Sequence, residues 1–165
     1  MFDISLQEHK RSPAFCAFST APVAFLRAFS GGASDHFYTF NGAEMQNAVQ
    51  HLGYKSEGIT GYIFTQQEPQ TIPLYRLFSG SASDHFYTTD PSERDRAAGS
   101  LGYTYEGIAG YLYTAEVCGA EPLYRLYSPK GSDHFYTMSA SERDNAARNI
   151  GYTFEGIVGY MLAAV

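Results

Sequence analysis

The amino-acid sequence predicts a β-rich α+β protein built from three tandem units of 49 residues, each a β-hairpin, a short helix and a strand. Three observations support this fold class. They are a repeat without insertions or deletions, an alternation of apolar and polar residues typical of short strands, and a helix-capping pattern in every copy. Because repeats of constant length pack against equivalent neighbours, we expect a closed, trefoil-like body with pseudo-threefold symmetry.

Identical residues recur at a spacing of 49 along the chain. The sets in this register include Arg27, Arg76 and Arg125; Asp35, Asp84 and Asp133; Gly53, Gly102 and Gly151; and Tyr62, Tyr111 and Tyr160. A chain of 165 residues can bury one sizeable core and is too short for two ordinary domains. We expect a single domain over 1–165, with an N-terminal strand segment at 1–21 and repeats at 22–70, 71–119 and 120–165.

Each unit is predicted to open with a β-hairpin, which in the second unit covers 74–78 and 84–88 around a Gly/Ser loop. A helix of about ten residues follows. Its start is marked by a capping residue with Glu three positions later, as in Asn41 and Glu44. Gly53 and its equivalents are expected to end the helices in the left-handed conformation.

The last element of each unit is a predicted strand, residues 106–113 in the second unit. Its paired glycines indicate a β-bulge or the close approach of another backbone. Residues 14–18 lie 49 positions before 63–67, at the end of the first unit. We therefore expect an N-terminal strand that pairs at the seam where the C-terminal end returns.

The composition argues against nucleic-acid and membrane partners. The net charge is −6 and the chain has no run of Lys and Arg, so the basic surface that binds phosphates is missing. Large rings come from 14 Tyr and 12 Phe, without any Trp, so these two residue types must supply most aromatic packing and contact.

The N-terminal residues and the two cysteines predict a location. Polar residues at 7–11 interrupt any apolar stretch, so we expect no signal peptide and no membrane insertion. Cys16 and Cys118 hold unrelated positions in the repeat, which favours free thiols in a reducing compartment. The expected location is cytoplasmic, or outside the cell by unconventional secretion.

Some repeated residues are explained by structure alone. Capping accounts for Glu44, Glu93 and Glu142, and alternation along the hairpin strand directs Phe37, Phe86 and Phe135 toward the core. A polar and aromatic set remains. It consists of Arg27, Arg76 and Arg125; Asp35, Asp84 and Asp133; His36, His85 and His134; Tyr38, Tyr87 and Tyr136; and Glu57, Glu106 and Glu155.

This set predicts ligand-binding residues. Side chains two positions apart on a strand share a face, so His85 and Tyr87 are expected together, as are their equivalents. A Tyr ring beside an imidazole and an Asp can stack on a sugar while the polar groups bind hydroxyls. An internal cluster of ion pairs would explain the Arg and Glu residues equally well. A third possibility is a zinc ion held by the three histidines, although we expect no metal or other cofactor.

The segments 124–128, 133–137 and 151–157 read Tyr-Arg-Leu-Tyr-Ser, Asp-His-Phe-Tyr-Thr and Gly-Tyr-Thr-Phe-Glu-Gly-Ile. They resemble the signature of a tandem-repeat domain family of unknown function found in mushroom and bacterial surface proteins, over residues 24–162. The resemblance implies lectin-like binding of carbohydrate or cell wall. The first copy departs from the signature, since Leu26 replaces Tyr75 and Tyr124, which predicts a weaker first site.

The arrangement of candidate residues favours binding over catalysis. Every candidate acid, base and nucleophile occurs three times, and motifs such as G-x-S-x-G or H-E-x-x-H are missing. Repeated weak sites instead give multivalent binding. We expect a non-enzymatic, lectin-like protein with up to three sugar sites, whose partners are glycans or glycoconjugates. The alternative is a structural or protein-interaction module in which the repeated polar residues are scaffolding.

Overall fold

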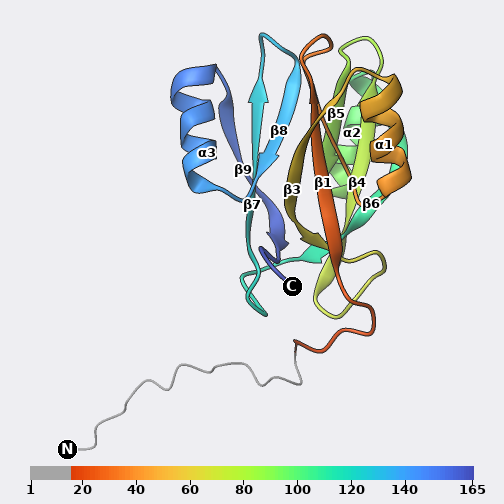
Figure 1. The fold of residues 1–165 in the computed structure, drawn as a ribbon, viewed down its shortest axis with the longest axis vertical. Helices are drawn as coiled ribbons and strands as arrows, with labels where there is room; N and C mark the ends of the chain where they lie inside the picture. The colour runs from red at the N-terminus through yellow and green to blue at the C-terminus, as the bar shows by residue number, and fades with distance from the viewer. Residues whose placement is uncertain (1–15) are drawn as a thin grey trace, which may run out of the picture.

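The computed structural model describes residues 16–165, in which each unit has two hairpin strands, a helix and a long last strand (Figure 1). The first unit contains β1 (Val23–Ser30), β2 (Asp35–Thr39), α1 (Gly42–His51) and β3 (Lys55–Ile63). The second contains β4 (Thr71–Ser79), β5 (Asp84–Thr88), α2 (Pro91–Ser100) and β6 (Thr104–Tyr113). The third contains β7 (Glu121–Ser128), β8 (Asp133–Thr137), α3 (Ala140–Asn145), a π-helical turn (Ala146–Ile150) and β9 (Thr153–Met161).

The strands form two sheets of unequal size. One has three strands in the order β2-β1-β3, and the other has six in the order β5-β4-β6-β9-β7-β8. The larger sheet arises because β6 and β9 pair at Tyr113 and Tyr160. The predicted trefoil-like, pseudo-threefold fold class is therefore wrong: the molecule is β-rich, with a curled six-stranded sheet beside a separate three-stranded one.

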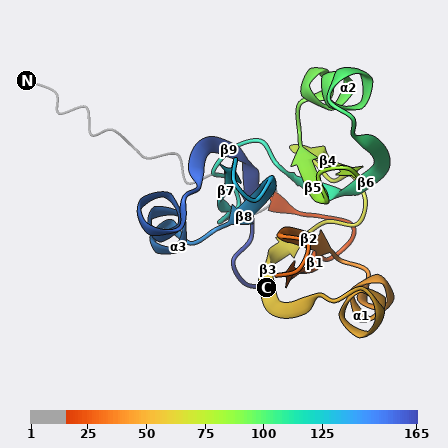
Figure 2. The same cartoon turned by 90° about the horizontal axis from the view of Figure 1, so that it is seen from above.

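The helices lie at the periphery and the hairpin strands β2, β5 and β8 face the middle of the molecule (Figure 2). Asn41, Asp90 and Ser139 cap the three helices through their side chains, as predicted. Gly53, with φ +79°, follows α1 in the left-handed conformation that the sequence predicted for it. None of the helices within residues 16–165 combines the length and the apolar character that spanning a membrane requires.

Two β-bulges shape the last strand of each unit. In the first unit Arg27 faces Gly58, whereas the following residue, Ala28, already faces Ser56. Glu57 is therefore an extra residue on β3, and Gly58 reaches the positive φ of +91° that the bulge requires. The bulge directs the Glu57 carboxylate to within 2.9 Å of the Arg27 Nε atom.

The core lies between the hairpins. Its largest fully buried side chains include Tyr38, Tyr87 and Tyr136, which are at most 1% exposed. Each of these rings contacts the other two at centroid distances between 5.3 and 5.5 Å. The predicted core positions Phe37, Phe86 and Phe135 are also buried, but the tyrosines that follow them on the opposite face are buried too, so these strands do not show the expected alternation.

A disulfide joins Cys16 to Cys118, so the prediction of two free thiols is wrong. Residues 17–22 form no strand, and Ala14 and Phe15 of the predicted N-terminal strand lie outside the described residues. Instead, Ser19 and Thr20 donate backbone hydrogen bonds of 2.9 and 2.8 Å to the buried Glu68 carboxylate. Within the described part of the chain, residues 16–22 are thus fastened by a covalent bond and by hydrogen bonds, without strand pairing.

Candidate functional site

An arginine joins each pair of neighbouring units. Arg76 on β4 donates from both terminal nitrogens to Glu44 on α1, at 2.9 and 3.0 Å, and from Nε to Glu106 on β6 at 3.0 Å. Forked contacts of this kind are the strongest hydrogen bonds between side chains. The equivalent contacts are Arg125 with Glu93 and Glu155, and Arg27 with Glu142 and Glu57. Each unit is therefore clamped to the helix of its neighbour.

The glutamates at the helix starts have a role that the capping pattern did not predict. The backbone N–H of the capping residue Asn41 donates to Thr39 Oγ1, which leaves the Glu44 carboxylate available to Arg76. Burial raises the pKa of Glu44, but the hydrogen bonds from Arg76 outweigh it and hold the pKa below its ordinary value. The assignment of these glutamates to capping alone is wrong.

The aspartates and histidines pair across the same interfaces. Asp35 accepts the backbone N–H of His85 at 2.7 Å, and its other oxygen lies 2.6 Å from His85 Nδ1. That second oxygen also accepts a hydrogen bond from Tyr54. The same arrangement links Asp84 with His134 and Tyr103, and Asp133 with His36 and Tyr152. Each buried carboxylate is thus satisfied by donors from two units.

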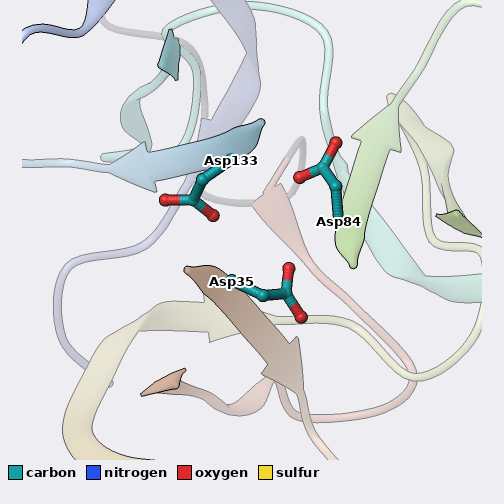
Figure 3. A group of neighbouring side chains, drawn as sticks. All are labelled: Asp35, Asp84 and Asp133. Atoms are coloured by element: carbon teal, nitrogen blue, oxygen red, sulfur yellow. The ribbon is translucent and has the colours of Figure 1, made fainter. Parts of the chain in front are cut away.

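The three aspartates converge on one point between the hairpins (Figure 3), with one oxygen of each within 4.8 Å of the others. Every one of these carboxylates already accepts three hydrogen bonds from protein donors, so the buried groups are satisfied without a metal. The three histidines point Nδ1 at three different carboxylates and do not share a ligand position.

Three clefts lie above these interfaces. Cleft A, of about 420 Å³, lies between units one and two; cleft B, of about 400 Å³, between units two and three; and cleft C, of about 270 Å³, between units three and one. Cleft A shows the shared plan, with a floor of ion pairs and apolar walls. Its lining includes Arg76, Glu44, Glu106, His85, Phe37 and the exposed Leu52.

Comparison with known families identifies the chain. A family model described as a domain of unknown function, DUF5648, matches residues 24–162. The chain belongs to this family. A search of curated proteins gave no match, and neither did a search of solved structures.

The predicted ligand-binding residues of this chain lie in two layers. The arginines, the histidines and Glu57, Glu106 and Glu155 line the clefts. Beneath them lie Asp35, Asp84 and Asp133, which are at most 1% exposed, and the three core tyrosines Tyr38, Tyr87 and Tyr136. The aspartate and tyrosine side chains of this lower layer are therefore too buried to contact a ligand.

Several other residues that line the clefts were not predicted from the sequence. These are the helix glutamates, the Phe walls, Tyr54 and its equivalents, and the exposed Leu52, Leu101 and Ile150. Their spacing of 49 was a usable signal. Leu26, in contrast, packs against the cluster under helix α1 and lines none of the three clefts, so it does not explain a weaker first site.

Proposed function

We propose that this protein is a non-catalytic carbohydrate-binding protein with up to three related sites, one in each cleft. The supporting observation is the pairing of polar and apolar groups in the same space. In cleft A, Arg76 and Glu106 stand beside the Phe37 ring and the exposed Leu52. A sugar ring has hydroxyls that need such charged partners and C–H faces that pack on apolar walls.

The lowered pKa of the glutamates at the helix starts argues against a role for these groups as the proton donor in glycoside hydrolysis. That reaction needs one carboxyl group whose pKa is raised so that it can donate a proton. In Glu44, Glu93 and Glu142 the pKa is lowered instead, because hydrogen bonds from the arginines outweigh the effect of burial. These groups are therefore suited to accepting hydroxyl hydrogen bonds and unsuited to general acid catalysis.

Three clefts on one chain suit multivalent partners. Linked weak sites can raise the apparent affinity by roughly 10²–10⁴ over a single site, without any new contact. We therefore propose glycans or glycoconjugates with repeated sugars as partners. The disulfide between Cys16 and Cys118 favours an oxidising environment, so the proposed place of action is outside the cytosol.

A glycan array followed by calorimetric titration with a bound sugar tests this proposal. Leu52, Leu101 and Ile150 are 59%, 56% and 58% exposed, so each can be replaced by Asp with little effect on folding. Each change should remove binding at one cleft and reduce the number of sites. Ile59→Asp is the matched control, since Ile59 is 54% exposed and lines none of the three clefts. An array without signal would contradict the proposal.

A second candidate is a structural or protein-interaction module, favoured by the burial of the repeated Asp and Tyr residues at the interfaces. Double replacement of His85 and Tyr87 by Ala separates the two. Loss of stability with unchanged sugar binding per folded molecule would show that these residues are scaffolding alone. A fall in binding per folded molecule would place His85 in the site, since Tyr87 is buried.

A further inference from the structure

The three clefts share ten lining positions, and cleft B differs from the others at two of them. The helix position is Asn47 in cleft A and Asn145 in cleft C, but Arg96 in cleft B. The strand position is Phe78 in cleft A and Phe29 in cleft C, but Tyr127 in cleft B. The arginines, glutamates, histidines and phenylalanines at the other positions are the same in all three. Cleft B therefore gains a cation and a hydroxyl on an otherwise common plan.

Arg96 differs from the cleft arginine that is common to all units. Arg125, its neighbour in cleft B, is already bound to the carboxylates of Glu93 and Glu155. Arg96 lies on the exposed face of α2, and within residues 16–165 it forms no ion pair or side-chain hydrogen bond. Its guanidinium keeps its donors available to a molecule in the cleft.

The presence of Arg96 gives the lining of cleft B a different net charge from the linings of clefts A and C. Clefts A and C each contain one arginine and two glutamates, which gives a surplus of one negative charge over these two residue types, and one histidine is common to all three clefts. Cleft B contains two arginines and two glutamates, so its lining is balanced before any ligand binds. An anionic ligand would meet repulsion in clefts A and C and an available cation in cleft B.

We infer that cleft B binds an acidic sugar, whose carboxylate pairs with Arg96, while clefts A and C take neutral sugars. This inference rests on the proposed carbohydrate-binding function. A guanidinium and a carboxylate form paired, charge-assisted hydrogen bonds, which are about twice as strong as neutral ones. The Tyr127 hydroxyl adds a donor and acceptor to the lining of cleft B, at a position where the other clefts have a Phe ring.

The experiment compares sugars that differ only in charge. Glucose and glucuronic acid, and galactose and galacturonic acid, are presented on identical linkers and titrated against the full chain. We expect the acidic member to bind about tenfold more tightly through a single site, which corresponds to one charge-assisted contact. Arg96→Asn, which restores the residue of clefts A and C, should abolish the preference. Arg148→Asn removes an exposed arginine of the third unit that lines none of the clefts, and should leave the preference unchanged.

The reverse exchange provides a test by gain of function. Asn47→Arg with Phe78→Tyr gives cleft A the lining of cleft B, and should raise the number of acidic-sugar sites from one to two. Binding of neutral sugars without a preference for the acidic members, or a preference that survives Arg96→Asn, would overturn this inference and leave the proposed function standing. Failure of both neutral and acidic sugars to bind would overturn both.

Discussion

The phenol oxygen of Tyr38 donates a hydrogen bond to the backbone carbonyl of Tyr136 and accepts one from the backbone N–H of the same residue, both at 2.8 Å. Tyr136 makes the same pair of bonds to Tyr87, and Tyr87 makes them to Tyr38. Each tyrosine hydroxyl thus satisfies the backbone N–H and carbonyl of a tyrosine in another hairpin, as the backbone of a paired strand would. The burial that this requires also raises the pKa of all three phenols well above the ordinary value.

Tyr87→Phe should lower the free energy of unfolding by about 2–4 kcal/mol, because it leaves the buried N–H and carbonyl of Tyr38 without partners. The measurement is urea denaturation followed by circular dichroism. Tyr105→Phe is the control, since Tyr105 is 43% exposed and its hydroxyl makes no hydrogen bond within the described residues. Equal losses in the two variants would contradict the role assigned to the hydroxyl.

Gly110→Ala should destabilise the fold by at least about 2 kcal/mol. Gly110 has φ +150°, and a Cβ atom there would lie 2.6 Å from Ile63 Cδ1 and 3.1 Å from the Phe64 carbonyl of the neighbouring unit. Gly99→Ala provides the comparison in the same unit, because a Cβ at Gly99 in α2 would meet open space. That change should stabilise the helix by about 0.5–1 kcal/mol. The melting temperatures of the two variants, each compared with that of the unchanged protein, test both expectations.

Cys118→Ser should lower the stability by about 2–4 kcal/mol, because the disulfide to Cys16 closes a loop across a sequence separation of 102 residues. Reducing agent should destabilise the original chain by a similar amount and leave the variant unchanged. Urea denaturation with and without reductant measures both effects. Ready labelling of two thiols in the folded, unreduced protein would show that the bond does not form.

The ion pairs predict a stability that is greatest between about pH 4.5 and 6.5. The pKa of Glu142 is lowered because the hydrogen bonds from Arg27 outweigh burial, and that of Glu57 is lowered by its hydrogen bond to His36. Their contribution is present above the ordinary carboxyl value of 4.5 and is lost as the pH falls through the lower folded values. Urea midpoints measured over a series of pH values test this acid limb.

The alkaline limb depends on His36. Burial lowers the pKa of His36, but its hydrogen bonds to Asp133 and Glu57 outweigh burial and raise the pKa above the ordinary 6.5. The stabilisation is full below pH 6.5 and is lost as the pH rises through the folded value. His36→Gln should therefore flatten the alkaline limb. Glu116→Gln, a change at an exposed carboxylate without an ion pair in the described chain, should alter neither limb.

The sequence predicted the local elements well because their signals are local. The capping residue Asn41 and the stop at Gly53 enclose α1, and the residues around Phe37 form the predicted hairpin strand. A spacing of 49 shows which residues are equivalent, but it does not show which copies touch. The partnership of Arg76 with Glu44 in the preceding unit therefore became visible only in the structure.

The assembly was less predictable for a physical reason. One pair, Tyr113 with Tyr160, merges two units into a single sheet, whereas the first unit meets its neighbours through isolated bridges that sequence patterns do not encode. The disulfide was missed because Cys16 precedes the first unit and has no equivalent in the repeat. Only the folded chain brings its Cα atom to 5.4 Å from that of Cys118, within the range that a disulfide needs.

Each cleft is assembled from two units, with the arginine and histidine from one and the helix and Phe wall from the other. A chain that grew by duplication would have had no cleft with one copy and a single cleft with two. The third copy adds two clefts at once, because Arg27 of the first unit meets Glu142 of the third. Every cleft therefore depends on two copies, and a substitution in one copy alters whichever of its two clefts that position lines.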